Sequence, residues 1–406
     1  MSIHTPERLR SARFAVSAAF FANGMMIGHW APKIPVMVER LGISEGMLGR
    51  MIILLGVGAL ISLIAGAWMV TRLGSVRVVR WTSLFLVPSL VLITITPTVV
   101  TTALAMLWLG AFLGAMDNAM NANGVGVETA LGKPVMSSYH GFWSLGGVFG
   151  GLTGGAMITY FGEMGHALIV TIMALAVVLW AWPRYLPDAA SFTQASSDGT
   201  QPAKFKGLPR HPGIYILGIV TLLGFAPEGT VIDWSALYLK DELGAPLIIS
   251  GYAVAAFSAT MAAMRFSGDS LRGIFGDRMT FIVSAAVSAV GLALAGYATT
   301  IVTVCIGFMI AGIGMANVVP ILFSTAGRFE GLSPAVGIAV ITVFGYAGLL
   351  FIPAFVGIIA EHYSIGLVFL LWGGIVGAVA LSGFVLPQIS GKKPSGDAVP
   401  GTPKGA

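Results

Sequence analysis

Three polar residues in the stretch 110–128 have the types and spacing for proton chemistry inside an apolar helix. Asp117, Asn121 and Glu128 recur at steps that an α-helix places on one face, while the opposite face is apolar. A charged side chain at the centre of a bilayer costs about 3 kcal/mol, so such groups are kept where they face a bundle interior or a wet cavity. Asp117 is therefore a candidate for binding and releasing a proton. The alternative is a structural hydrogen bond or ion pair with a neighbouring helix.

A second carboxylate, Glu228, follows Pro227 in another apolar stretch. A proline frees a backbone carbonyl in a helix and permits a bend, so Glu228 could bind a solute or a proton at that bend. The alternative is a polar residue whose hydrogen bonds are satisfied at a kink. Asp117 and Glu228 are the predicted proton-coupling residues. Glu128 fits an inner gate and an interfacial acid near Lys133 equally well.

Amide and aromatic side chains complete the predicted solute site. Asn23, Asn121 and Asn317 lie in apolar stretches, where an amide could bind solute hydroxyls or hold two helices together. Trp143 could stack on the apolar face of a sugar, although tryptophan is also common at membrane interfaces. Together with Glu228, these four residues are predicted to bind the substrate.

The composition of the chain indicates a membrane protein. Its 406 residues are 56% hydrophobic and 10% charged, whereas soluble proteins carry about 25% charged residues. The net charge of +5 does not indicate a nucleic-acid partner, because the charges lie in short links between apolar stretches. Cys305 is the only cysteine, which excludes an intrachain disulfide and a cysteine metal cluster. The glycine-rich stretch 146–155 lacks the lysine of a phosphate-binding loop, and we expect no cofactor, metal site or catalytic residue.

Twelve apolar stretches are long enough to span a bilayer as helices. They cover approximately residues 12–31, 46–71, 76–97, 100–127, 136–160, 165–185, 212–239, 246–267, 279–298, 300–327, 334–360 and 364–387. Of the 22 lysine and arginine residues, only Lys33, Arg40, Arg50 and Lys240 fall on one side of the predicted membrane. Because basic loops stay in the cytoplasm, both termini and the long middle loop are predicted to be cytoplasmic.

The two halves of the chain repeat each other. Gly74 matches Gly276 at a shift of 202 residues, and Asp117 matches Asn317 at a shift of 200. The deeply placed polar residues fall on the first, fourth, seventh and tenth predicted helices, so one central cavity lined by all four is the simplest arrangement. The predicted division is an N-terminal six-helix half at 1–186, a cytoplasmic linker at 187–211, a C-terminal six-helix half at 212–387 and a disordered cytoplasmic tail at 388–406.

Four motifs carry a resemblance to a known family. They are Trp30-Ala-Pro-Lys-Ile-Pro, the run from Asp117 to Glu128, Met136-Ser-Ser-Tyr-His and Asp233-Trp-Ser-Ala-Leu-Tyr. With them the chain resembles the major facilitator superfamily along nearly its whole length. Within that superfamily it is similar to rhizopine-transport proteins and, more distantly, to fucose permeases. The resemblance implies an all-α polytopic membrane protein with twelve transmembrane helices in two pseudo-symmetric six-helix halves. It also implies alternating access around a central solute site, with proton coupling through an embedded carboxylate.

Residues near the ends of these helices are predicted to form gates. The outer gate residues are His29, Trp30, Asp233 and Trp234. The inner gate residues are Glu128, His140, Arg265, Asp269 and Arg272. The loop at 70–77 lacks the aspartate that the superfamily usually carries there, whereas its second-half counterpart keeps Asp269. We therefore expect the inner gate to be latched asymmetrically.

These features predict a secondary active transporter and not an enzyme. The expected solute is small, polar and neutral or cationic, sugar-like or an amino-polyol, because the predicted cavity offers acids and amides and no deep arginine or lysine. The expected partners are this solute, the proton and the lipid bilayer, with no nucleic acid. We expect a monomer in the inner or plasma membrane. A drug or metabolite efflux pump of the same fold and a solute sensor built on it are the alternatives.

Overall fold

The computed structural model describes residues 5–133, 135–188, 209, 211–386 and 389, without the side chains of 268, 269, 334, 335 and 349. This part of the chain is helical and contains no strand. Its first-half helices are α1 (Pro6–Leu41), α2 (Glu45–Leu73), α3 (Ser75–Leu86), α4 (Ser89–Ile95), α5 (Val99–Leu131) and α6 (Met136–Ala181). The second-half helices are α8 (Pro212–Leu237), α9 (Tyr252–Tyr297), α10 (Ile301–Gly327), α11 (Pro334–His362) and α12 (Ile365–Val385).

Two long helices are each divided by a glycine. Gly162 in α6 has φ 72° and Gly276 in α9 has φ 74°, a backbone conformation that favours glycine. Ten segments of the described chain are long and apolar enough to span a membrane, with α6 counted once and α1 not counted. Dividing α6 at Gly162 and adding α1, whose hydropathy is lowered by Asn23, His29 and Lys33, gives the twelve predicted membrane helices.

The first helix is longer than the sequence predicted. The first apolar stretch was expected to end near residue 31, but α1 continues to Leu41 with Pro32 and Pro35 inside it. Lys33 therefore lies within the bundle, and its side chain is 0% exposed instead of lying in a loop. Lys33 pairs with Glu163 of α6, which compensates the cost of burying its charge.

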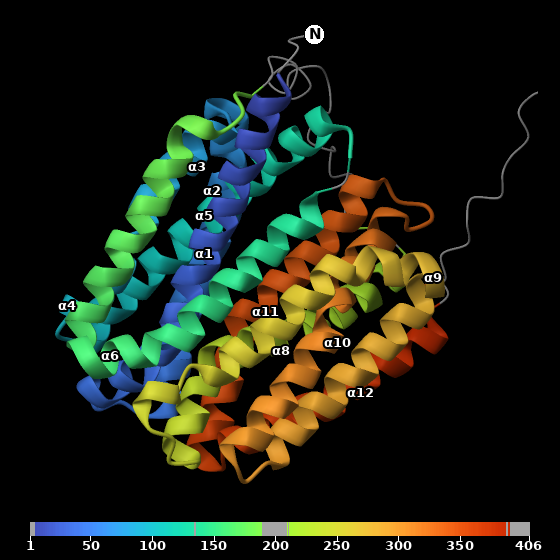
Figure 1. Cartoon of the computed structure of the whole chain (residues 1–406). Helices are drawn as coiled ribbons and strands as arrows, with labels where there is room; N and C mark the ends of the chain where they lie inside the picture. Colours follow the sequence, from blue (N-terminus) through green and yellow to red (C-terminus); the bar gives the residue numbers. More distant parts are fainter. Residues whose placement is uncertain (1–4, 134, 189–208, 210, 387–388, 390–406) are drawn as a thin grey trace, which may run out of the picture.

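The helices form two bundles that follow the order of the chain (Figure 1). In the first half α1 packs on α6 and α2 on α5, and in the second half α9 packs on α10 and α12. Across the halves α2 contacts α11 and α6 contacts α9. This arrangement is the all-α membrane fold of two pseudo-symmetric halves that the sequence predicted.

Glycines bring the two halves together at the end away from the N-terminus. A Cβ atom on Gly49 of α2 would lie 2.4 Å from the carbonyl oxygen of Pro353 in α11. A Cβ atom on Gly251, just before α9, would lie 2.2 Å from the carbonyl oxygen of Gly151 in α6. The two halves therefore touch backbone to backbone at this opposite end.

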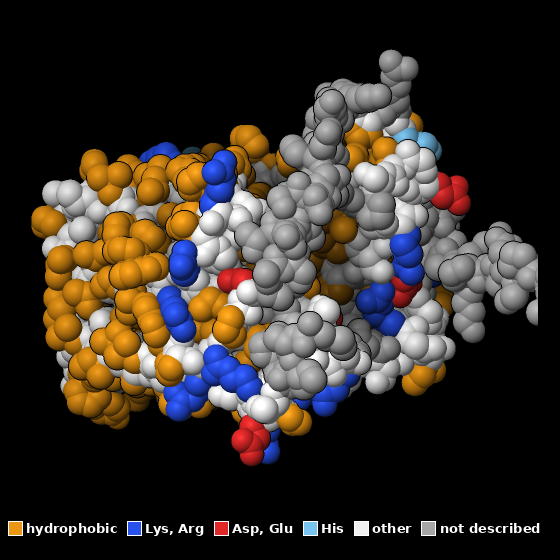
Figure 2. Space-filling view, turned by 90° about the horizontal axis from the view of Figure 1, so that it is seen from above, with side chains coloured by type: hydrophobic (Ala, Val, Ile, Leu, Met, Phe, Trp, Pro, Cys, Tyr) orange, Lys and Arg blue, Asp and Glu red, His pale blue; other side chains and the backbone are white. Residues whose placement is uncertain are grey.

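The end at which α1 begins is rich in lysine and arginine side chains, and we call it the basic end (Figure 2). Arg8 and Arg80 donate to the carbonyl oxygens of Pro183 and Trp182 beyond α6, and Arg278 donates to that of Gly383 in α12. These arginines satisfy carbonyl groups that a helix end leaves unpaired. Most of the predicted linker and the predicted tail lie outside the described residues.

Candidate functional site

A partly buried arginine links the two halves of the bundle. Arg265 of α9 donates from one guanidinium nitrogen to Ser144 Oγ of α6 at 2.8 Å. Its other terminal nitrogen pairs with Glu228 Oε1 of α8 at 3.3 Å. The Arg265 guanidinium carbon also lies 5.7 Å from the ring centroid of Trp143 on α6, within range of a cation–π interaction. One second-half side chain thus contacts two first-half residues.

Trp143 extends this polar cluster through the first half. Its indole nitrogen donates to Asn23 Oδ1 on α1 at 2.9 Å, and Asn23 Nδ2 donates to the carbonyl oxygen of Leu113 on α5 at 3.2 Å. Gly24 permits this approach, because a Cβ atom there would lie 1.9 Å from the carbonyl oxygen of Trp143. The central cluster is therefore made of Asn23, Trp143, Ser144, Glu228 and Arg265.

The place of Arg265 corrects one sequence prediction. The assignment of Arg265 to the inner gate stays a prediction, but the cavity was expected to contain no deep arginine or lysine. The guanidinium instead pairs with Glu228, which is only 7% exposed. A long arginine side chain reaches several ångströms from its backbone, so the position of Arg265 near the end of an apolar stretch did not reveal the depth of its charge. A buried carboxylate with a cationic partner costs less than an unpaired one.

Asp117 has a different environment. Asn121 Nδ2 donates to Asp117 Oδ1 at 3.1 Å and to the Asp117 carbonyl oxygen at 2.9 Å, so these two predicted site residues are neighbours on α5. Within the described part of the chain, no lysine or arginine forms an ion pair with Asp117. Tyr346 of α11 lies within electrostatic range of this carboxylate, so Asp117 faces the second half.

Two other predicted site residues have contacts away from the central cluster. Asn317 on α10 is buried and its Nδ2 lies 3.5 Å from Ser284 Oγ on α9, inside the second half. Glu128 accepts hydrogen bonds from the backbone nitrogens of Val135 and Met136 at 2.6 and 2.8 Å. Glu128 thus caps the start of α6, because the N-cap residue Val135 has no side chain that can accept a hydrogen bond. Glu128 forms no described gate contact. An acid just upstream of a helix start is the signal that could have predicted this cap.

Comparison with known proteins identifies the family. A sequence model of the Major Facilitator Superfamily matches residues 16–272. This chain belongs to the Major Facilitator Superfamily. It is therefore a multi-pass membrane transporter and not an enzyme.

Its relatives cover nearly the whole chain. An uncharacterized transporter of Sinorhizobium fredii, y4wD, is 32% identical over 94% of this chain and 100% of its own length. The membrane protein MosC of Rhizobium meliloti is 30% identical over 93% of this chain and 91% of its own length. Among solved structures, a D-xylose-proton symporter has a TM-score of 0.73 at 14% identity, covering 94% of this chain and 99% of that one. At that identity the symporter shows the shared fold alone.

Two of the predicted outer gate residues meet across the halves of this transporter. Trp30 Nε1 of α1 donates to Asp233 Oδ1 of α8 at 3.0 Å. Trp234, which follows Asp233 in the sequence, is buried and only 1% exposed. A second bridge joins the same halves nearby, because Lys240 Nζ lies 2.7 Å from Glu39 Oε2. The opposite end is therefore closed by polar as well as backbone contacts.

His29, the fourth predicted outer gate residue, does not contact the second half through any described hydrogen bond. Its Nδ1 lies 3.1 Å from Nε2 of His166, which is on α6 of the same half. Both imidazole rings are fully buried, and His29 Nε2 and His166 Nδ1 have no hydrogen-bond partner. The sequence did not predict this pair, because the two residues are 137 positions apart and only packing brings them together.

An ion-pair cluster around the buried Lys33, near that histidine pair, was also missed. Lys33 Nζ lies 2.9 Å from Glu163 Oε1, and Arg40 Nε lies 3.2 Å from Glu163 Oε2. Lys33 also donates to Thr94 Oγ1 on α4 at 2.5 Å. Glu163 directly follows Gly162, so the break in α6 positions the carboxylate that holds α1 at this end.

The predicted inner gate residues do not form a bridge between the halves in the described structure, apart from Arg265. Arg272 Nε donates to Asp277 Oδ1 at 2.8 Å, and Arg328 donates to the other Asp277 oxygen, all within the second half. The His140 ring packs edge-on against Phe20, with centroids 5.0 Å apart. The side chain of Asp269 lies outside the described part of the chain.

Proposed function

We propose that this chain is a proton-coupled secondary transporter of a small polar solute, neutral or cationic, that works by alternating access. A sugar-like compound or an amino-polyol is the proposed class. The observation that carries the proposal is the central cluster, in which Arg265 joins Glu228 to Ser144 and Trp143 across the two halves. Polar groups that meet between two apolar bundles are suited to a solute that contacts both.

The charges around this cluster support the choice of solute. Arg265 is neutralised by Glu228, so it offers no free cation to an anionic solute. Asp117 has no cationic partner among the described residues, which leaves the region between the halves with an excess of negative charge when Asp117 is ionised. Such a region favours neutral or cationic compounds. The shared fold of a D-xylose-proton symporter is consistent with a sugar-like solute and with proton coupling.

The proposed roles divide between the carboxylates and the gates. Asp117 carries the coupling proton, while Glu228, with Asn23, Asn121 and Trp143, binds solute. Asn317 binds solute in a conformation in which α10 exposes its side chain. Trp30 and Asp233 close the outer side, and Arg272 and Asp269 act at the inner side after the halves rock. His29, Trp234, Glu128 and His140 support these gates from within one half.

We also propose the orientation and the division of the chain. The basic end faces the cytoplasm of the inner or plasma membrane, and the halves at 1–186 and 212–387 move as units around the linker at 187–211, within a monomer. In a Cys305→Ala background, a cysteine at Lys133 should then label only from the cytoplasmic side and one at Pro97 only from outside. The reverse labelling pattern would overturn the orientation.

Transport by the purified protein tests the function. In proteoliposomes, an inwardly directed proton gradient should drive accumulation of at least one neutral or cationic polyol, amino-polyol or sugar, and a protonophore should abolish it. Accumulation of only organic anions would contradict the proposed solute class. Outward drug transport driven by the same gradient would favour an efflux pump, and binding without transport would favour a sensor.

A further inference from the structure

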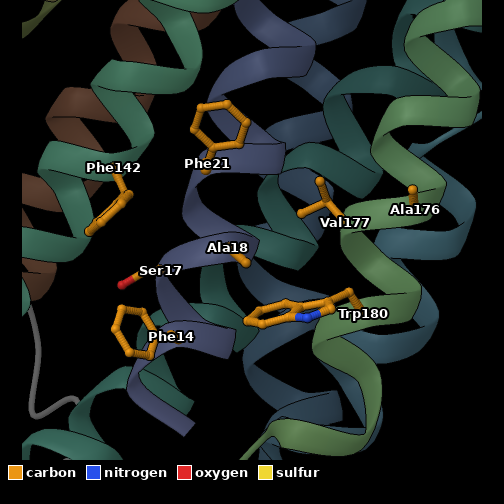
Figure 3. A pocket seen from close by; sticks show the side chains of 8 residues that line it. All are labelled: Phe14, Ser17, Ala18, Phe21, Phe142, Ala176, Val177 and Trp180. Atoms are coloured by element: carbon orange, nitrogen blue, oxygen red, sulfur yellow. The ribbon is translucent and has the colours of Figure 1, made fainter. Parts of the chain in front are cut away.

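A groove on the surface of the first half is separate from the central cluster. It has a volume of about 490 Å³, which is in the range of small-ligand pockets (Figure 3). Phe14 and Trp180 stand on either side with Ala18 between them, and Phe142 forms a further wall. Phe14 is 47% exposed and Trp180 is 46% exposed, so the groove is open at the apolar surface of the bundle.

The sequence of α1 explains the shape of this groove. Phe14, Ala18 and Phe21 recur at steps of four and three, which places them on one face of the helix. At 1.5 Å per residue this stripe runs for about 10 Å along the helix, part of one bilayer leaflet. The small side chain of Ala18 forms the floor between larger aromatic walls. The result is an elongated apolar channel that runs along the helices.

Two arginines lie against the aromatic walls of the groove. The Arg184 guanidinium carbon lies 4.5 Å from the ring centroid of Trp180, and that of Arg10 lies 5.8 Å from the ring of Phe14. Both belong to the basic end, and neither forms an ion pair with a carboxylate in the described structure. Their charges are therefore available to an anion at the mouth of the groove.

We propose that this groove binds an anionic phospholipid, with one acyl chain along Ala18 and the phosphate held by Arg10 and Arg184. Arginine on the basic side of a membrane helix bundle is suited to anionic headgroups, because its planar donors match phosphate oxygens. A zwitterionic phospholipid has the same acyl chain but lacks the net negative charge. A soluble phosphate has the charge but cannot use the apolar channel.

The bound lipid acts on the contact between the halves at the basic end. The Phe142 ring, a wall of the groove, packs edge-on against Phe266 of α9 with centroids 6.4 Å apart. Phe266 directly follows Arg265 of the central cluster. An acyl chain behind Phe142 supports this aromatic contact and favours the conformation in which the halves meet there.

Lipid binding to the purified full-length protein tests the proposal directly. Native mass spectrometry in detergent would compare phosphatidylglycerol with phosphatidylcholine of the same acyl chains. Two arginine contacts predict binding of phosphatidylglycerol about tenfold or more tighter. The double variant Arg10→Gln/Arg184→Gln should bind both lipids equally, whereas the matched control Arg72→Gln/Arg77→Gln, which removes two charges at the same end, should keep the preference.

A second set of variants fills the groove. Ala18→Trp should weaken binding of both lipids about tenfold or more, and Ala176→Leu provides the same test if Ala18→Trp does not yield folded protein. Unchanged phosphatidylglycerol binding in the double arginine variant or in the filled groove would overturn the proposal. Displacement of the lipid by glycerol phosphate would also overturn it, because it would identify a site for soluble anions.

Discussion

Away from the Glu163 ion pairs of the first half, the two halves of this transporter differ in the partners of their acidic side chains. In the second half, Glu228 pairs with Arg265, and Asp277 binds both Arg272 and Arg328. In the first half, Asp117 is bonded only to a neighbouring amide among the described contacts. In the repeat between the halves Asp117 matches Asn317 and not Glu228, so the two carboxylates stand at different places in the fold, and we propose that they have different roles. The paired acid is suited to a fixed position, and the unpaired acid is suited to gaining and losing a proton.

The same difference appears at the connection between the second and third helices of each half. Asp277 follows Gly276 directly, and its carboxylate contacts arginine side chains. In the first half Ser75 follows Gly74, and the carboxylate comes from Asp188, which accepts hydrogen bonds from the Ser75 nitrogen at 3.1 Å and from the Ser75 hydroxyl. Each connection thus keeps an acid at the helix start, but only the second half uses it in ion pairs.

The largest expected effect is at the unpaired acid. Asp117→Asn mimics the protonated form and removes the proton step, so we expect pH-driven accumulation to fall more than about tenfold while counterflow exchange remains measurable. Both assays would be run on the same proteoliposomes. In the double variant Asp117→Asn/Asn317→Asp, the new carboxylate should not restore accumulation, because residue 317 faces Ser284 within the second half. Wild-type accumulation by Asp117→Asn would show that Asp117 is structural and would remove the contrast between the halves.

The next effect is expected at the paired acid. Arg265→Gln leaves the Glu228 carboxylate buried without its cation and should lower the free energy of unfolding by about 3 kcal/mol. The double variant Arg265→Gln/Glu228→Gln should recover most of that loss, because no unpaired charge remains. Thermal unfolding in detergent would measure both, with Asp117→Asn as the control that breaks no ion pair. Equal destabilisation by the single and double variants would mean that the pair itself is not what stabilises this site.

The smallest effect concerns the two helix connections. Asp277→Asn breaks ion pairs that are partly exposed and should cost about 1 kcal/mol at low salt and less at high salt. Asp188→Asn retains one side-chain oxygen that can accept the hydrogen bonds from Ser75 but loses the oxygen that accepts from the Val76 nitrogen. It breaks no ion pair, so its cost should be independent of salt. Unfolding midpoints measured at two salt concentrations would separate the two cases. A strong salt dependence of the Asp188→Asn effect would show that Asp188 stabilises the helix start through its charge and not through its hydrogen bonds.

Sequence reasoning predicted the elements of this fold well and their mutual contacts less well. Apolar length and the repeat between the halves predicted the membrane helices, because both are local or periodic properties. The buried position of Lys33 was missed, because its partner Glu163 lies 130 residues away and nothing local specifies which helices touch. The depth of Arg265 was missed because side-chain reach is not visible in hydropathy. Glu128 could have been interpreted as a helix cap, since its hydrogen-bond partners are only seven and eight residues away.

The glycine contacts at the opposite end have a consequence for how the halves separate. Where α2 meets α11 and α6 meets the start of α9, the backbones approach each other closely at Gly49, Gly151 and Gly251. Interlocked side chains would have to change rotamer before two helices could separate. Helices that meet at glycines can tilt or slide against each other without such rotamer changes. We propose that the polar bridges from Trp30 to Asp233 and from Lys240 to Glu39 hold the halves together at this end. In the proposed alternating access, opening this end requires these polar bridges to break.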